Sequence, residues 1–185
     1  MVLEQLTEVL DKLNIAYVIG GSMASSAYGA VRFTQDADIT VEPVGLIAEK
    51  LFDVLKDDFY ISKEAMFEAL KNRSSFNVIH FATAFKIDIF IRAENEFQRQ
   101  MLVRSRKMRL GASNKEVSFV SPEDIILLKL DWYRQSEYAS QRQWSDVQGV
   151  LAAQAALLDF EYLKNWAGKL GLTELLTRAI SESQT

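Results

Sequence analysis

The sequence contains no cysteine and a single histidine, His80. Without cysteine the chain can form no disulfide, zinc–thiolate site or iron–sulfur cluster, and it has no thiol nucleophile. One histidine also excludes metal sites that are built from several imidazoles. Any metal ion bound by this chain would therefore have to be held by oxygen ligands.

Long hydrophobic runs are missing as well. No stretch approaches the roughly 20 apolar residues that span a bilayer, and residues 1–14 carry charged side chains and no long apolar run. We therefore expect no signal peptide, no membrane segment and a cytoplasmic protein. The 21 Lys and Arg residues face 25 Asp and Glu residues, and this net charge of −4 disfavours a general nucleic-acid coat.

What remains is the composition of a folded globular protein. The 185 residues are 49% hydrophobic and 25% charged, and only two are proline. A chain of this length suits one domain, or one domain with a small appendage, and can bury a sizeable core.

The chain changes character near residue 120. Before it, helical and extended patterns alternate; after Ser121-Pro122-Glu123-Asp124, a strong helix start, only helical periodicity is found. We predict strands at 15–19, 36–42, 76–81, 86–91 and 117–120, and helices at 2–13, 23–28, 44–57, 63–71, 95–103, 122–136, 142–155, 159–169 and 173–183. The sequence thus predicts an α/β core over 1–120 followed by a helical C-terminal region over 121–185.

Two aspartates begin the second predicted strand. Asp36 and Asp38 are two residues apart, so they project from one face of a strand while Ala37 and Ile39 project from the other. Adjacent carboxylates repel and raise one another's pKa unless a cation lies between them. Carboxylate oxygens of this kind suit Mg²⁺, which binds one or two carboxylates together with substrate phosphates.

A third acid stands in another apolar strand. Asp88 is the only acid among residues 86–91, where an unpaired buried charge would be costly. If this strand lies beside the first pair of acids, Asp36, Asp38 and Asp88 form a three-carboxylate site. Such a site could hold two Mg²⁺ ions at the attacking and leaving oxygens of a nucleotidyl transfer.

The turn Gly20-Gly21-Ser22 lies between a predicted strand and a predicted helix. Glycines let the backbone approach a ligand closely, and a helix start offers free N–H groups to an anion. We predict that this turn binds phosphate, with Arg32, Thr34 and Lys86 as further candidates for nucleotide contact. Arg32 and Lys86 also have plain alternatives, a solvated loop residue and a partner for the acids.

Two groups of charged residues have both a functional and a structural interpretation. Five cations between Arg99 and Arg109 could form an RNA or acceptor surface, although a solvated edge is favoured. Lys129 in the helical region could reach a triphosphate, although ion pairs between helices are favoured for it and its charged neighbours.

The order Gly21-Ser22, a spacer of thirteen residues, Asp36-x-Asp38 and a later Asp88 resembles the polymerase-beta-type nucleotidyltransferase superfamily. The string from Gly20 to Ile39 looks most like its small bacterial branch of AbiE-like and minimal nucleotidyltransferases. The resemblance implies a mixed sheet with helices, Mg²⁺ ligation by the three aspartates and NTP phosphates on Gly21 and Ser22.

The resulting hypothesis is an enzyme that moves a nucleoside monophosphate from an NTP to a hydroxyl or phosphate acceptor and releases pyrophosphate. RNA such as tRNA, a protein or a small molecule remain open as acceptor, as does a homodimer or a partner protein. The alternative is a nucleotide-binding or interaction module of a toxin–antitoxin or defence pair with little turnover.

Overall fold

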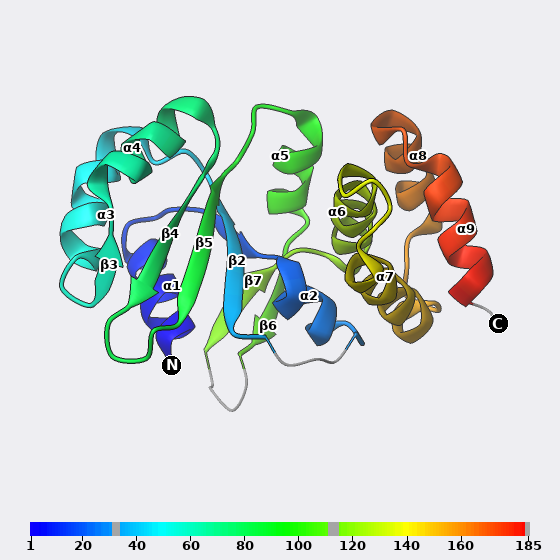
Figure 1. The fold of residues 1–185 in the computed structure, drawn as a ribbon, viewed down its shortest axis with the longest axis horizontal. Helices are drawn as coiled ribbons and strands as arrows, with labels where there is room; N and C mark the ends of the chain where they lie inside the picture. Colours follow the sequence, from blue (N-terminus) through cyan, green and yellow to red (C-terminus); the bar gives the residue numbers. More distant parts are fainter. Residues whose placement is uncertain (31–33, 111–114, 184–185) are drawn as a thin grey trace. The chain divides into compact units, whose positions relative to one another are not determined.

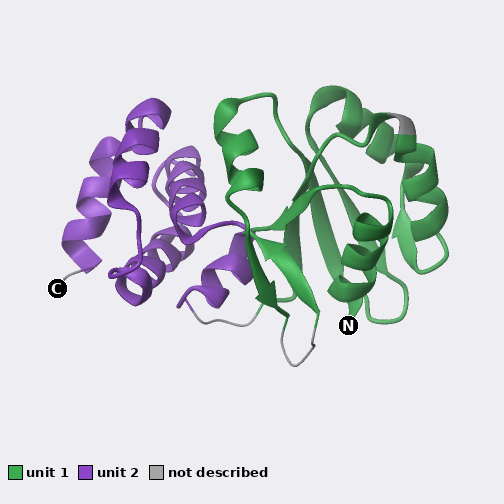
Figure 2. Ribbon diagram, turned by 180° about the vertical axis from the view of Figure 1, so that it is seen from behind, with its two compact units in different colours: residues 1–20, 34–119 green, residues 21–33, 120–185 purple. Residues whose placement is uncertain are grey.

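The computed structural model describes residues 1–30, 34–110 and 115–183 (Figure 1). The chain divides into two compact units (Figure 2). Unit 1 comprises residues 1–20 and 34–119, and unit 2 comprises residues 21–33 and 120–185. The second unit thus combines the C-terminal helices with a short segment that follows the first strand.

Unit 1 is built on a seven-stranded mixed sheet, counted over the described residues, with the strand order β3-β4-β5-β2-β1-β7-β6. The strands are β1 (Tyr17–Ile19), β2 (Asp36–Val41), β3 (Phe59–Ile61), β4 (Ser75–His80), β5 (Lys86–Ile91), β6 (Arg106–Arg109) and β7 (Glu116–Phe119). The pairs β2–β5 and β1–β7 are parallel and the other pairs are antiparallel. The mixed α/β architecture predicted from the sequence is therefore confirmed.

Alternation along the strands places the core on one face of the sheet. In β2 and β5 the residues at odd positions, such as Ile39 and Ile89, are buried, whereas the residues between them are half-buried or exposed. Since neighbouring side chains on a strand point to opposite faces, the apolar set defines a buried face. The polar set, which includes the three aspartates, defines the other.

The helices of unit 1 follow the apolar spacing of the sequence. They are α1 (Val2–Lys12), the 3-10 turn η1 (Gly45–Ile47), α3 (Ala48–Leu55), α4 (Lys63–Asn72) and α5 (Glu96–Val103). Helix α1 buries Leu3, Leu6 and Leu10, spaced three and four residues apart, and contacts α3. Helix α4 packs on β4 and β5.

Unit 2 is helical. It contains α2 (Gly21–Ala27), α6 (Pro122–Gln135), α7 (Gln141–Gln154), α8 (Phe160–Leu170) and α9 (Thr173–Ser183). The start of α6 is as predicted: Ser121 caps the helix by accepting a hydrogen bond from the Asp124 N–H, and Pro122 occupies the first turn. Within the described part of the chain, no helix is long and apolar enough to cross a bilayer.

Glycine lets the residues that follow α2 approach α7 closely within unit 2. A Cβ built on Gly149 of α7 would lie 2.9 Å from Ala30 Cβ, and one built on Gly29 would lie 2.2 Å from Ala153 Cβ. Real Cβ atoms do not come so close, so both positions depend on glycine. Helix α2 itself contacts α6 and α7, and it therefore groups with the helical unit although it follows β1 in the chain.

Candidate functional site

The register of the sheet brings the predicted acids together on one face of unit 1. Asp38 of β2 lies directly opposite Asp88 of β5, and Asp36 lies opposite Lys86. Paired strands are about 4.8 Å apart, so these four residues are neighbours on one face of the sheet, the acid cluster. The structure thus juxtaposes residues that are fifty positions apart in the sequence.

The cluster is partly open to solvent. Asp36 is exposed, while Asp38 and Asp88 are half-buried. Lys86 Nζ lies 2.7 Å from Asp88 Oδ2, with side-chain exposures of 43% and 25%. The pKa of Lys86 is raised, mainly by its hydrogen bond to Asp88, and the charges of Asp36 and Asp38 act in the same direction. Lys86 therefore supplies positive charge that the three carboxylates would otherwise lack.

Thr34 is coupled to the cluster through Asp36. Its hydroxyl donates to Asp36 Oδ1 at 2.6 Å and lies 3.1 Å from the Asp36 carbonyl oxygen. This contact joins Thr34 to the Asp36 carboxylate, and nucleotide contact by Thr34 stays a prediction. Arg32, the other candidate in this segment, lies outside the described residues.

The glycine turn begins at the edge of the acid cluster. The Gly20 N–H donates to the carbonyl oxygen of Asp38 at 2.8 Å, which extends the β1–β2 pairing to the residue that carries the central carboxylate. Gly21 follows with φ +54°, a left-handed conformation that favours glycine. Ser22, the next residue, is half-buried. The chain therefore leaves the sheet beside Asp38 through a turn whose left-handed conformation at position 21 favours glycine.

A divalent cation would suit the donors of this cluster. In the part of the chain that the structure describes, no three His, Asp or Glu side chains converge closely enough to hold a metal ion. The carboxylates of Asp36, Asp38 and Asp88 nevertheless share one face, and oxygen donors are those that Mg²⁺ prefers. A metal ion bound there would take over the charge compensation that the Lys86 ammonium provides at Asp88.

Asn77 is a neighbour of the acids that the sequence analysis did not single out. It lies on β4 directly opposite Asp88, on the same face, and it is exposed. The signal was present in the predicted strands 76–81 and 86–91, because a hairpin register fixes which residues face each other. Asn77 adds an amide donor and acceptor next to the third carboxylate.

The remaining charged candidates are dispersed. Lys129 forms a buried ion pair with Asp146 between α6 and α7, with Nζ and Oδ2 2.8 Å apart. Arg106, Lys107 and Arg109 are exposed along β6, the strand at one edge of the sheet. The favoured interpretation of Lys129 as a helix-pairing residue is thus the one that the geometry supports.

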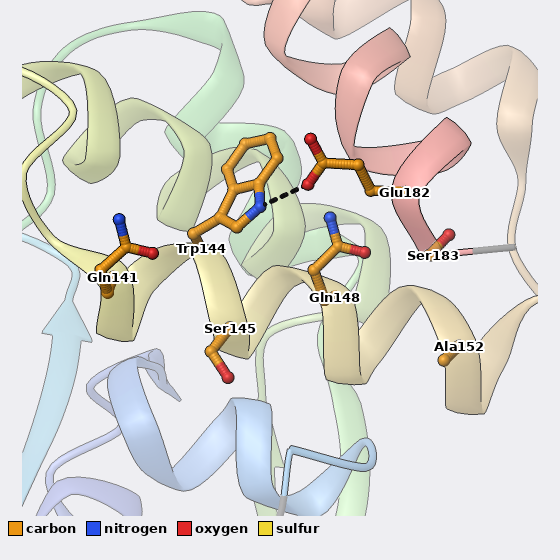
Figure 3. A pocket seen from close by; sticks show the side chains of 7 residues that line it. All are labelled: Gln141, Trp144, Ser145, Gln148, Ala152, Glu182 and Ser183. Atoms are coloured by element: carbon orange, nitrogen blue, oxygen red, sulfur yellow. Dashed lines mark hydrogen bonds between the residues drawn. The ribbon is translucent and has the colours of Figure 1, made fainter. Parts of the chain in front are cut away.

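Unit 2 contains a separate shallow recess of about 480 Å³ between α7 and α9 (Figure 3). There the indole N–H of Trp144 donates to Glu182 Oε2 at 2.9 Å, and the Arg178 guanidinium lies 4.4 Å from the indole centroid. The polar groups at Glu182 and Trp144 are satisfied by each other and by Arg178. None of the predicted site residues that the structure describes lines this recess.

Comparison with known proteins identifies the fold. No protein-family model and no curated protein matches the sequence. The solution structure of the antibiotic-resistance factor ANT(2'')-Ia is 15% identical with a TM-score of 0.55, over 98% of this chain and 92% of that chain. The crystal structure of ANT(2'')-Ia in complex with adenylyl-2''-tobramycin is 14% identical with a TM-score of 0.53, over 91% of this chain and 94% of that chain.

An antigenic nucleotidyltransferase-like protein from Paracoccidioides brasiliensis is 18% identical with a TM-score of 0.53, over 96% of this chain and 92% of that chain. Identities this low establish the fold alone, and the small bacterial branch suggested by the sequence stays a prediction. The acid cluster on β2 and β5 therefore belongs to a chain with the fold of nucleotidyltransferases.

Proposed function

We propose that this protein is a nucleotidyltransferase that transfers a nucleoside monophosphate from an NTP to a hydroxyl or phosphate acceptor and releases pyrophosphate. The observation that carries the proposal is the β2–β5 register, which pairs Asp38 with Asp88 and keeps Asp36 on the same face. This arrangement occurs in a chain with a nucleotidyltransferase fold.

The three carboxylates would hold Mg²⁺, with two ions expected from the number of acids. When bound, the metal ions would neutralise charge on the phosphates and on the attacking and leaving oxygens. The backbone of Gly20 and Gly21 and the Ser22 hydroxyl would receive the phosphates. Lys86, released from Asp88, would be free to contact a phosphate oxygen, and Arg32 is assigned a similar contact.

The transfer itself exchanges one phosphorus–oxygen bond for another. The acceptor oxygen forms a bond to the α-phosphorus, and the bond from that phosphorus to the pyrophosphate oxygen breaks. With a hydroxyl acceptor, its proton would pass to the Asp88 carboxylate, which lies opposite the exposed Asn77. Asn77 would hold the acceptor by hydrogen bonds while this proton moves, and Thr34 would keep Asp36 oriented.

A hydroxylated small molecule is the first acceptor class to test. ANT(2'')-Ia was solved with adenylyl-2''-tobramycin, so a hydroxylated small molecule is a natural first probe for this chain. RNA and protein acceptors stay in the test because the acid cluster itself does not select among them.

Calorimetric titration of ATP, GTP, CTP and UTP with Mg²⁺ tests the proposal directly. Wild-type protein should bind at least one NTP only when Mg²⁺ is present, and Asp36→Asn/Asp38→Asn should lose that binding. Asp53→Asn is a matched control, because Asp53 is an exposed acid of the same unit paired with Lys56 at 2.7 Å. Metal-independent binding, or equal binding in the double variant, would contradict the proposed site.

Pyrophosphate release then separates turnover from binding. The wild type is assayed with tobramycin, with total RNA and with a protein extract, each with the preferred NTP. Release that depends on one acceptor identifies the acceptor class. Metal-dependent NTP binding without release from any acceptor would favour the alternative, a nucleotide-binding module with little turnover.

A further inference from the structure

One buried side chain ties the start of α2 to two other helices of unit 2. Ser25 is fully buried, and its hydroxyl lies 3.2 Å from Asp146 Oδ2 on α7. The same carboxylate oxygen lies 2.8 Å from Lys129 Nζ on α6. Three helices therefore meet in one buried polar network.

The same hydroxyl reaches the backbone of the first turn of α2. Ser25 Oγ lies 3.2 Å from the carbonyl oxygen of Ser22 and 3.4 Å from that of Gly21. A hydroxyl has one proton to donate, so the Asp146 carboxylate and these carbonyls share it. The position of Asp146 is thereby linked to the backbone of Gly21 and Ser22.

The other end of α2 is held by different means. The Tyr28 hydroxyl donates to the Val120 carbonyl oxygen at 2.8 Å, and Gln154 Nε2 donates to the Tyr28 carbonyl oxygen at 3.2 Å. The close approach of Gly149 to Ala30 adds a steric constraint nearby. These contacts hold the C-terminal end of α2. The network through Ser25 holds the N-terminal end of the same helix.

Stability alone does not account for the ion pair in this network. The Lys129 and Asp146 side chains are only 6% and 4% exposed. Removing two charges from water is costly, and apolar side chains of similar volume often stabilise a core as well or better. The pair is therefore better explained by the geometry it imposes on its third member, Ser25.

We propose that Lys129, Asp146 and Ser25 are positioning residues that hold the first turn of α2 in the conformation that receives the nucleotide's phosphates. The inference rests on the proposed function, in which Gly21 and Ser22 bind those phosphates. Lys129 acts through Asp146 and Ser25, and makes no contact with the nucleotide itself.

Ser25→Ala tests the link while leaving the ion pair in place. Mg²⁺-dependent NTP binding should weaken by about tenfold or more, as expected when the residue that orients a binding group is lost. Amide hydrogen exchange should become faster at Ser26, whose N–H bonds the first-turn carbonyl of Ser22 in the helical pattern. Ser136→Ala is the matched control, because its hydroxyl donates to the Tyr133 carbonyl oxygen at 2.8 Å in the same unit. Wild-type affinity and exchange in Ser25→Ala overturn the inference.

Lys129→Met/Asp146→Leu separates positioning from stability. This variant should unfold at the wild-type temperature or above, yet bind NTP as weakly as Ser25→Ala. A lower unfolding temperature with wild-type affinity in the folded protein shows a purely structural pair and overturns the inference.

The two proposals can fail separately. If the wild type binds no NTP under any condition, the proposed function fails. Hydrogen exchange at Ser26 still decides the positioning role, because it needs no nucleotide. Unchanged exchange in Ser25→Ala then overturns the inference on its own.

Discussion

Asp88→Asn should abolish most activity while leaving the fold intact. Asparagine keeps the size of the side chain and one acceptor oxygen, but removes the charge that lies opposite Asp38. The substitution therefore changes the electrostatics of the acid cluster and little else. Its effects on stability and on turnover should differ by a large margin.

The stability change follows from exposure. Asp88 loses its ion pair with Lys86, whose side chain is 43% exposed, and surface pairs of this kind contribute at most about 1 kcal/mol. Repulsion between Asp88 and Asp38 disappears at the same time, which offsets part of the loss. The free energy of unfolding should therefore change by less than about 1 kcal/mol, and Tm by less than about 4 °C.

The rate change follows from the charge that a metal site supplies. Metal ions contribute several kcal/mol of charge stabilisation to a transfer step, and each 1.4 kcal/mol corresponds to about a tenfold change in rate. Pyrophosphate release by Asp88→Asn should thus fall by about 100-fold to 1,000-fold.

The assay compares pyrophosphate release and thermal unfolding for wild type, Asp88→Asn and Asp53→Asn. The control deletes a Lys–Asp pair of the same length, 2.7 Å, from the surface of the same unit, and should retain full activity. Turnover within tenfold of wild type in a folded Asp88→Asn would refute the assignment of Asp88 to the site. Loss of activity in proportion to lost stability would refute it too.

Three further predictions concern other parts of the chain. Gly29→Ala should lower the free energy of unfolding, measured by urea titration, by about 1–3 kcal/mol. The new Cβ would lie 2.2 Å from Ala153 Cβ, and the backbone at position 29 has φ +127°. An unfolding free energy equal to that of wild type would contradict this packing. Arg178 lowers the pKa of Glu182, so the ionised Glu182 stabilises the fold above the ordinary glutamate pKa, and this stabilisation is lost as pH falls through the lowered value. The urea midpoint of Glu182→Gln should therefore decline less on acidification than that of wild type. Parallel pH curves for the two proteins would refute this prediction. Calorimetry of Lys86→Met should show stronger Mg²⁺ binding without nucleotide, because Asp88 has lost its competing cation. The same variant should bind Mg²⁺–NTP more weakly, because the proposed phosphate contact of Lys86 is gone. Changes of the same sign in the two affinities would contradict the proposed release of Lys86 from Asp88.

The helices were predictable because their packing repeats every three to four residues. The predicted helix over 122–136 corresponds to α6 (Pro122–Gln135), and its start was encoded locally by Ser121 and Pro122. Ends and breaks were less accurate: the predicted helix over 44–57 is divided into η1 and α3. Local capping residues and the spacing of apolar residues thus predicted most of the helices.

Two strands escaped prediction because their sequences lack the usual pattern. Strand β6 (Arg106–Arg109) contains three cations and no β-branched residue, and β3 (Phe59–Ile61) is only three residues long. Each lies at an edge of the sheet, where β6 pairs with β7 and β3 pairs with β4. Such strands depend on tertiary pairing more than on their own propensity.

The acid cluster was predictable in its members but not in its register. That Asp36 and Asp38 share a face follows from a repeat of two along a strand. That Asp88 lies opposite Asp38 depends on parallel pairing between β2 and β5, which β3 and β4 separate in the chain. Asn77 and the link from Ser25 to Asp146 depend on similar long-range contacts, which no local pattern encodes.

The placement of three aspartates in two strands also argues for function on physical grounds. Aspartate is unfavourable in strands, where β-branched residues pack better, and three like charges on one face repel each other. Among the strand residues that the structure describes, Lys86 is the cation that the register places directly among the three aspartates. Since natural sequences otherwise keep local preference and fold consistent, a cluster that violates both propensity and charge balance is best explained by what it binds. The same reasoning predicts that Asp36→Asn/Asp38→Asn is no less stable than wild type at neutral pH, and a clear loss of stability would show that these acids serve the sheet.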